Sequence, residues 1–301
     1  MRPTGSITAL ATPFTASCAI DFPAWERLLQ AQLEGGTDAL VVAGSTGEAA
    51  ALEDDEQDAL LSRAVAFIAG RIPVIAGTGQ SGTVKTVART RRAAALGADA
   101  ALVVTPPYVR PTQAGLVAHY LAVADAGELP VLLYNVPGRT GCDLLPETVA
   151  TLARHPRIIG LKEARNEPER MQALLPLRNE TFCLLSGDDP TFVRAMLAGA
   201  DGVVSVASNV VPAAFAALVA LAASGDADNA RRLDGRLHPL YDFLAVESNP
   251  IPLKALLALT GIGDGPRLPL TPLSAVHATL ARQMATEVAA IEDSVRDVAD
   301  A

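Results

Sequence analysis

The 301-residue sequence has few aromatic residues, 4% of the total, although 50% of its residues are hydrophobic. A core with so few aromatic rings must be built mainly from Ala, Val, Leu and Ile. That composition favours helices and parallel strands over an aromatic-rich β-sandwich. A chain of this length forms either two domains of average size or one large α/β barrel with an appendage.

Long basic clusters and long apolar segments are also missing. The formal net charge is −9, and no basic cluster exceeds Arg91-Arg92 or Arg231-Arg232, which argues against nucleic acid as a partner. The longest apolar run, residues 210–223, is shorter than the roughly 20 residues that cross a bilayer. Residues 1–5 lack the charged start and apolar segment of a signal peptide. We therefore expect no membrane association and a cytoplasmic location.

Cysteine is scarce as well. The three cysteines are odd in number and widely spaced, so we expect free thiols rather than a disulfide framework or a zinc site: Cys18, Cys142 and Cys183. The pair Asp188-Asp189 could suggest a metal, but the four histidines all fall on expected helices or at their ends: His119, His155, His238 and His277. No metal site is therefore predicted. A hydrolase is not expected either, because no Gly-x-Ser-x-Gly motif accompanies a suitably placed Asp and His.

One pattern recurs along the chain. Residues 36–42, 97–104 and 199–204 each contain a helix-ending Gly, then an Asp and an apolar strand. The spacing between these segments corresponds to two and four units of roughly 25 to 30 residues, the length of a strand plus a returning helix. This rhythm is typical of parallel βα units.

When this unit length is applied along the chain, the sequence predicts eight strands, at residues 6–11, 39–43, 72–77, 100–105, 130–135, 157–162, 181–186 and 202–207. Amphipathic segments lie between them, for example 53–69 and 82–96, the second with Ser81 as N-cap and Gly97 after its last residue. The predicted fold class is α/β, a (β/α)8 TIM barrel. A doubly wound open sheet is the alternative, but no Gly-x-Gly-x-x-Gly follows the first strand.

The expected strands stop at about residue 224. Residues 227–244, 252–259 and 272–298 read as helices, which predicts a barrel domain over residues 1–224 and a C-terminal helical appendage over residues 225–301. The appendage is too apolar for a disordered tail, so we expect it to pack on the barrel or on a neighbouring subunit.

Lysine is the rarest of the charged residue types in this chain, with only three copies. Lys85 falls between apolar positions at helical spacing and is expected at the surface, and Lys254 lies on a probable helix. Lys162, in contrast, ends the apolar run of residues 157–161. Burial disfavours an ammonium and leaves more free amine, which can attack a carbonyl and form a Schiff base. Alternatively, Lys162 snorkels to solvent or pairs with Glu163.

The other candidate residues follow the expected strands, because the site of a (β/α)8 barrel lies at their carboxyl ends. Residues 44–48 form either a plain strand-to-helix turn or a nest of backbone amides with two hydroxyls that binds a carboxylate. Tyr134 is either a core tyrosine or a group that exchanges protons with a substrate. Arg139 is either solvated or binds a second carboxylate at the pocket mouth.

The chain resembles the dihydrodipicolinate synthases, pyruvate-dependent class I (Schiff-base) aldolases whose superfamily also includes the N-acetylneuraminate lyases. The resemblance runs from Thr4 to about Pro272 with nearly constant spacing. Its motifs are Gly44-Ser45-Thr46-Gly47-Glu48, Tyr134-Asn135-Val136-Pro137, Arg139-Thr140-Gly141, Lys162-Glu163-Ala164, Ser186-Gly187-Asp188-Asp189, Gly202-Val203-Val204-Ser205-Val206 and Asn249-Pro250-Ile251-Pro252-Leu253-Lys254. Residues 139–141, 186–189 and 249–254 distinguish the synthases within the superfamily.

The resemblance implies a cofactor-free lyase of lysine and diaminopimelate biosynthesis that condenses pyruvate with aspartate semialdehyde. It implies a Schiff base on Lys162 and a site completed by seven other residues. These are Tyr134, Ser45 and Tyr108 as a proton relay, Thr46 for the pyruvate carboxylate, Arg139 for the semialdehyde carboxylate, and Gly187 and the Val204 carbonyl along the pyruvate. Tyr108 would come from a neighbouring subunit of a homotetramer, a dimer of dimers. Ser45 replaces a threonine and keeps the hydroxyl.

The resemblance also bears on regulation. Lysine-inhibited members of the family bind lysine at a subunit interface, through positions that here hold Ala49, Asp54, Gln57, Ser81, Lys85 and Pro107. Lys85 stands where those enzymes have a glutamate that pairs with the amine of the effector, and Pro107 replaces a tyrosine. We therefore predict weak or absent inhibition by lysine.

Two other readings remain open at this stage. The chain could be another pyruvate aldolase, such as a neuraminate or keto-deoxy-sugar-acid lyase, although Arg139 stands where those enzymes need a polyol-binding site. It could also be a catalytically silent paralogue that binds a keto acid. The chain retains Lys162, Tyr134, Thr46 and a relay hydroxyl, which argues against the silent paralogue.

Overall fold

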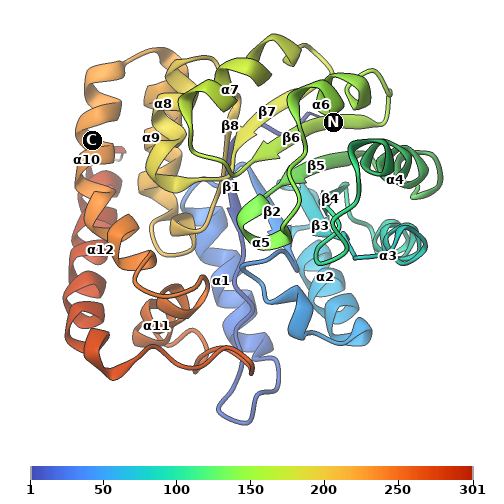
Figure 1. Cartoon of the computed structure of the whole chain (residues 1–301). Helices are drawn as coiled ribbons and strands as arrows, with labels where there is room; N and C mark the ends of the chain where they lie inside the picture. Colours follow the sequence, from blue (N-terminus) through green and yellow to red (C-terminus); the bar gives the residue numbers. More distant parts are fainter. Residues whose placement is uncertain (1, 300–301) are drawn as a thin grey trace.

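The computed structural model describes residues 2–299, so Met1 and residues 300–301 of the two expected domains lie outside it. Its centre is a closed barrel of eight parallel strands, each paired with its sequence neighbours, β8 closing on β1 (Figure 1). The strands are β1 (Gly5–Ala9), β2 (Ala39–Val42), β3 (Val74–Gly77), β4 (Ala100–Val104), β5 (Val131–Asn135), β6 (Ile158–Glu163), β7 (Cys183–Ser186) and β8 (Gly202–Ser205). The predicted TIM barrel is confirmed, and the open sheet is wrong.

Helices surround the barrel and continue past its last strand. The α-helices are α1 (Phe22–Glu34), α2 (Asp54–Ile68), α3 (Thr83–Ala95), α4 (Gln113–Ala126), α5 (Pro137–Thr140), α6 (Pro146–Leu152), α7 (Pro168–Leu174), α8 (Phe192–Leu197), α9 (Pro212–Ser224), α10 (Ala227–Leu244), α11 (Ile251–Leu259) and α12 (Ala278–Ala299). Short 3-10 turns are η1 (Ala49–Ala51), η2 (Leu175–Leu177), η3 (Asp189–Thr191), η4 (Ala207–Asn209) and η5 (Ala275–His277). No helix within residues 2–299 is long and apolar enough to cross a membrane.

The recurring Gly and Asp have a clear structural role. Gly36, Gly97 and Gly199 adopt positive φ values of 76°, 89° and 116°, which L-residues with a Cβ rarely adopt, and each follows a helix. Each following Asp then accepts a hydrogen bond from a backbone N–H of the neighbouring strand: Asp38 from Ser6 (2.7 Å), Asp99 from Val74 (2.8 Å) and Asp201 from Leu184 (2.9 Å). The pattern therefore ends a helix and ties adjacent strands of the barrel together.

Some predicted boundaries are wrong for local reasons. β3 begins at Val74 rather than residue 72, since Pro73 has no N–H to donate. β7 begins at Cys183 rather than residue 181, since the Asn179 side chain binds the N–H groups of Thr181 and Phe182 in a turn. The N-cap of α3 is Gly82, not Ser81, whereas Gly97 does follow the helix end as predicted.

The appendage packs on one side of the barrel. Figure 1 shows α10, α11 and α12 in orange to red beside α9 and the blue α1. One apolar cluster joins them to the barrel helices, with Phe192 and Phe215 from α8 and α9 against Leu237, Tyr241 and other residues of α10. The third predicted appendage helix starts six residues later than expected, at Ala278. Because this core is shared, the division at residue 224 stays a prediction.

Candidate active site

A bulge in β6 sets the positions of the two central side chains. Val131 of β5 pairs with Ile158, but the next residue of β5 pairs with Gly160, so Ile159 is an extra residue in β6. After the bulge, Tyr134 lies directly opposite Lys162. Both side chains point into the barrel, and Nζ of Lys162 lies 4.3 Å from the centroid of the Tyr134 ring.

Lys162 is buried, with only 5% of its surface exposed. Its side chain passes over Gly187, where an added Cβ would lie 2.8 Å from Cε of Lys162. No carboxylate forms an ion pair with Lys162 within the part of the chain that the structure describes. The suggested pairing with Glu163 is wrong, because Glu163 points to the opposite side of the strand and pairs with Arg170 at 2.8 Å. Lys162 thus has a packed stem and an amine free of ion pairs.

The loop of residues 44–48 presents consecutive backbone donors. The N–H groups of Glu48 and Ala49 bind carbonyls of the same loop. Those of Ser45, Thr46 and Gly47 have no hydrogen-bond partner among residues 2–299. Three free successive N–H groups beside two hydroxyls fit a small carboxylate, which favours the nest over a plain turn.

The appendage contacts this loop directly. Thr46 is buried, and its Oγ1 accepts a hydrogen bond from Nδ2 of Asn249 at 3.1 Å. The Asn249 carbonyl in turn accepts from Nη2 of Arg139 at 3.0 Å. The two residues expected to hold the two substrate carboxylates are therefore linked through Asn249.

Sequence reasoning missed a second buried lysine. Lys254 on α11 places Nζ 2.5 Å from Oε1 of Glu48, and both side chains are at most 3% exposed. Oε2 of Glu48 accepts the N–H of Arg267 at 3.0 Å. Burial lowers the pKa of Lys254 to about 8, even though Glu48 favours its charged form. Glu48 and Lys254 both belong to motifs that carry the family resemblance, but nothing in those motifs indicates that the two side chains pair.

The remaining predicted residues lie at different distances from this centre. Val204 is buried in the cluster inside the barrel that also contains Tyr134. Ser45 is half-buried on its loop, and its hydroxyl forms no hydrogen bond with Tyr134 among the described residues. Arg139 is exposed on α5. Tyr108 is 91% exposed with a positive φ of 74°, so its own chain does not place it in the site.

Asp188 and Asp189 accept hydrogen bonds within the loops that follow β7 and β8. Oδ2 of Asp189 accepts the N–H groups of Val206 and Ala207, which joins the loop after β7 to the loop after β8. Burial raises the pKa of Asp189 to about 6. Residues 2–296 contain no group of three His, Cys, Asp or Glu side chains able to hold a metal ion. The three cysteines are free, as predicted.

A closed parallel barrel carries a buried lysine at the carboxyl end of one strand, and its amine has no ion pair among the described residues. This arrangement and the family match together identify the class of protein, an aldolase-type lyase. The chain belongs to the Dihydrodipicolinate synthetase family, whose sequence description matches residues 2–288.

Individual relatives agree with this assignment. The chain is 63% identical over 292 residues to the 4-hydroxy-tetrahydrodipicolinate synthase of Xanthomonas axonopodis pv. citri. The aligned region covers 97% of both chains. The crystal structure of the chloride-inhibited dihydrodipicolinate synthase from Acinetobacter baumannii, complexed with pyruvate, is 42% identical. It superposes with a TM-score of 0.93 over 95% of this chain and 99% of that one. The enzyme from Cyanidioschyzon merolae, with lysine bound, is 38% identical with a TM-score of 0.91 over 95% and 98%.

Proposed function

We propose that this chain is a 4-hydroxy-tetrahydrodipicolinate synthase of lysine and diaminopimelate biosynthesis. It condenses pyruvate with L-aspartate 4-semialdehyde in the cytoplasm and uses no cofactor. The observation that carries the proposal is the amine of Lys162, buried, free of ion pairs and 4.3 Å from the Tyr134 ring. The 63% identical Xanthomonas relative bears the same name.

The first chemical step is formation of a Schiff base. The neutral amine of Lys162 attacks the ketone carbon of pyruvate, and loss of one water leaves an iminium. The free N–H groups of the 45–47 loop and the Thr46 hydroxyl hold the pyruvate carboxylate. Gly187, whose missing side chain leaves space for the lysine stem, and the carbonyl of Val204 line the pyruvate side of the site.

The iminium then acidifies the pyruvate methyl group. Loss of a proton to the relay of Tyr134 and Ser45 gives an enamine, whose carbon attacks the aldehyde. The aldehyde oxygen takes up a proton from the relay. The amino group of the semialdehyde then displaces the Lys162 amine, which closes the ring and regenerates the enzyme. Arg139 at the exposed rim binds the semialdehyde carboxylate during this sequence.

The relay is completed by a second copy of the chain. Tyr108 is almost fully exposed and held in a left-handed conformation, so its phenol projects away from its own barrel. An exposed aromatic ring of this kind suits insertion into a partner site, within a tetramer built as a dimer of dimers.

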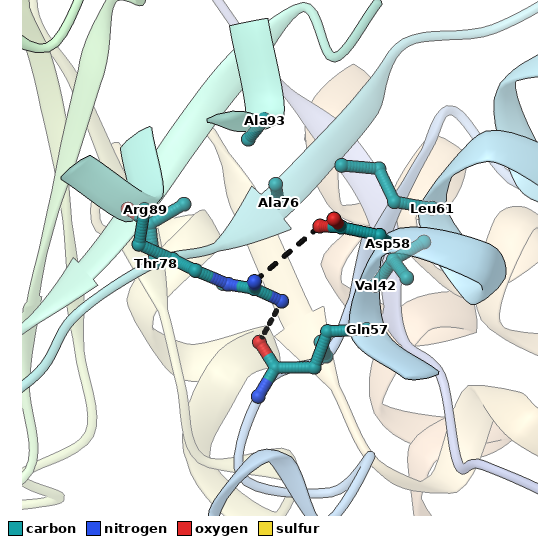
Figure 2. Close-up of a pocket in the computed structure, with 10 residues that line it drawn as sticks. Val42, Gln57, Asp58, Leu61, Ala76, Thr78, Arg89 and Ala93 are labelled. Atoms are coloured by element: carbon teal, nitrogen blue, oxygen red, sulfur yellow. Dashed lines mark hydrogen bonds and ion pairs between the residues drawn. The ribbon is translucent and has the colours of Figure 1, made fainter. Parts of the chain in front are cut away.

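The side chains at the positions of the corresponding interface support weak inhibition by lysine. The Arg89 guanidinium donates to Oε1 of Gln57 and pairs with Asp58 at 3.3 Å (Figure 2). It also pairs with Asp54 at 3.3 Å. The cavity beside Arg89 measures 10 Å³, room for about one water molecule. Lys85 is exposed one turn earlier on α3. A lysine ammonium would therefore meet the cations of Arg89 and Lys85, and Oε1 of Gln57 already accepts a hydrogen bond from Arg89.

Turnover of the purified protein tests the proposal. Product formation from pyruvate and aspartate semialdehyde is coupled to a dihydrodipicolinate reductase, with Lys162→Ala as control and lysine titrated in. We expect activity that Lys162→Ala abolishes and that lysine leaves unchanged. Half-inhibition by lysine below the millimolar range would refute the regulatory part. Pyruvate trapped on Lys162 without turnover would support the Schiff-base chemistry and indicate that the second substrate is another aldehyde.

A further inference from the structure

Two buried polar side chains lie directly behind the candidate site. Asn135 and Glu163 follow Tyr134 and Lys162 on β5 and β6, and consecutive strand side chains point to opposite faces. Tyr134 and Lys162 thus face the barrel interior, while Asn135 and Glu163 face the surrounding helices. Both outward side chains are 0% exposed, and the two residues are strand partners.

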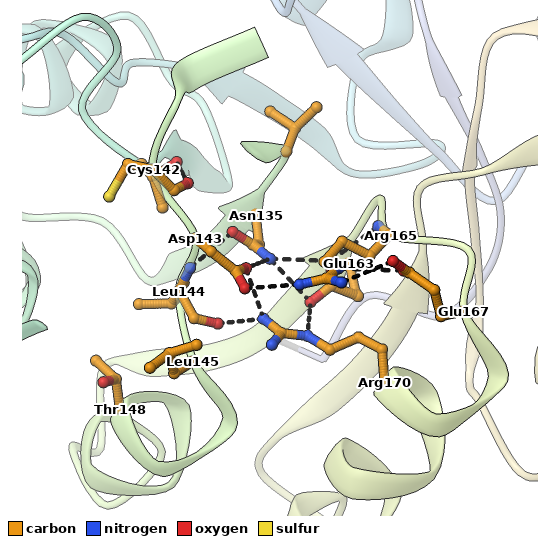
Figure 3. Close-up of polar contacts among 12 residues, drawn as sticks. Asn135, Cys142, Asp143, Leu144, Leu145, Thr148, Glu163, Arg165, Glu167 and Arg170 are labelled. Carbon is orange, nitrogen blue, oxygen red and sulfur yellow. Dashed lines mark hydrogen bonds and ion pairs between the residues drawn. The ribbon is translucent and has the colours of Figure 1, made fainter. Parts of the chain in front are cut away.

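Glu163 is the centre of a fully satisfied network (Figure 3). Its carboxylate accepts from Nδ2 of Asn135 at 3.0 and 3.1 Å, from Nε of Arg170 at 2.8 Å and from the N–H of Arg165 at 2.9 Å. Burial raises the pKa of Glu163, and Arg170 opposes that rise. The network therefore depends on the guanidinium of α7.

The same network reaches the segment that follows Arg139. Nδ2 of Asn135 also donates to Oδ1 of Asp143 at 2.8 Å, and that oxygen accepts from Nη2 of Arg170 at 3.1 Å. Oδ1 of Asn135 accepts the N–H of Leu144 at 2.9 Å. The side chains of Asn135 and Glu163 thus join the ends of β5 and β6, helix α7 and residues 143–144.

The bulge gives this network a function. The extra residue interrupts the backbone hydrogen bonds between the two strands. Beyond the bulge, these hydrogen bonds alone therefore specify the register of the strands less strongly. The bond between Asn135 and Glu163 lies at the last register pair of the two strands, next to the pair formed by Tyr134 and Lys162.

We propose that Glu163 and Arg170 are positioning residues for the reaction of Lys162. They hold the ends of β5 and β6 in register through Asn135 and so keep the lysine amine against the Tyr134 ring. This inference rests on the proposed function, in which that amine attacks pyruvate. Displacement of a reacting group by about 1 Å can cost up to a hundredfold in rate.

The test compares Glu163→Gln with Glu167→Gln. Both changes remove one carboxylate, but Glu167 lies at the exposed edge of the network, and among the described residues its carboxylate bonds only the Arg165 side chain. We expect Glu163→Gln to lower kcat and the rate of borohydride trapping of pyruvate by about tenfold or more, with the KM values unchanged within about twofold. Glu167→Gln is expected to match the parent protein in all three.

Two further measurements separate positioning from simple stability. In Glu163→Gln, Arg170 keeps Asp143 but loses its buried carboxylate partner. The double variant Glu163→Gln/Arg170→Gln also removes this half-paired guanidinium, so we expect it to regain part of the melting temperature but not the rate. A crystal structure of Glu163→Gln should show Nζ of Lys162 displaced from the Tyr134 ring, a result that needs no substrate. Parent-like rates at a lowered melting temperature, or an unmoved Lys162, would overturn the inference. Failure of the parent protein itself to trap pyruvate would instead contradict the proposed function.

Discussion

At the scale of single residues, Gly187 and Lys162 depend on each other. The lysine stem occupies the space that any side chain at position 187 would need, with Cε and Cγ only 2.8 and 3.1 Å from an added Cβ. The glycine φ is not in the left-handed region, so the requirement for glycine is a matter of space and not of backbone conformation. Position 187 therefore controls where the amine of Lys162 points.

Gly187→Ala is expected to push the lysine side chain aside. The Cε end of that side chain is flexible, so folding should survive while the amine moves out of line with the pyruvate site. We expect kcat/KM for pyruvate to fall by about tenfold or more, with a melting temperature close to that of the parent. Steady-state kinetics and thermal unfolding measure both quantities. An unchanged kcat/KM would show that Gly187 does not position the amine.

Sequence reasoning placed Lys162 at the end of a buried strand, which is confirmed, and placed Lys254 on a helix without predicting that it is buried. Lys162 ends a run of apolar strand residues, a local signal that is visible in a short stretch of chain. The partner of Lys254, Glu48, lies 206 residues away, and a lysine on an apolar helix gives no hint of it. Pairings over such a distance follow only from the folded arrangement of the barrel and the appendage.

At the scale of elements, helix packing buries a histidine between α3 and α4. Nδ1 of His119 lies 3.0 Å from the Thr83 hydroxyl, and its Nε2 is buried without a partner among the described residues. Burial lowers the pKa of His119 to about 4. The expectation that His119 falls on a helix is confirmed, and its ring packs against Tyr120 with 5.2 Å between the ring centroids.

Stability should therefore fall in acid. The unfolded chain binds a proton at His119 near pH 6.5, whereas the folded chain does so only near pH 4. The contribution of this residue is present above pH 6.5 and is lost as the pH falls toward 4, by about 3 kcal/mol. Denaturant unfolding of the parent and of His119→Phe at pH 7 and pH 4 measures the difference. An equal acid loss in the two proteins would contradict this assignment.

The positions of the strands could be predicted where the sequence pattern is periodic. They could not be predicted where the pairing between two strands decides the structure. The Gly-Asp segments before β2, β4 and β8 supplied the rhythm of the barrel, since each Gly and Asp has a fixed backbone role. The bulge at Ile159 could not be predicted, because an extra residue in an apolar run is visible only against its partner strand. Without it, Lys162 would not lie opposite Tyr134.

At the scale of the whole molecule, the appendage completes the candidate site. Lys254 and Arg267 hold Glu48, and Asn249 binds both Thr46 and Arg139. The sequence indicated that the appendage packs on the barrel or on a neighbour. It did not indicate that the contact falls on the proposed pyruvate loop, because the side chains involved are far apart in the chain.

Lys254→Met tests this role of the appendage. The change leaves the Glu48 carboxylate buried without its cation, which we expect to cost about 3 kcal/mol or more in the free energy of unfolding. The loosened loop should also raise the KM for pyruvate more than it lowers kcat. In Glu48→Gln/Lys254→Met the stability should return in part. If Lys254→Met keeps the parent's KM for pyruvate, the ion pair stabilises the fold but does not contribute to pyruvate binding.

The most direct measurement of the account's central claim is the site of pyruvate trapping. The protein is incubated with pyruvate and sodium borohydride, digested, and each of its three lysines is examined by peptide mass spectrometry. We predict a reduced pyruvate adduct on Lys162 alone, with none on Lys85 or Lys254 and none in Lys162→Ala. The absence of any adduct, or an adduct on buried Lys254 in place of Lys162, would contradict the proposed Schiff-base chemistry.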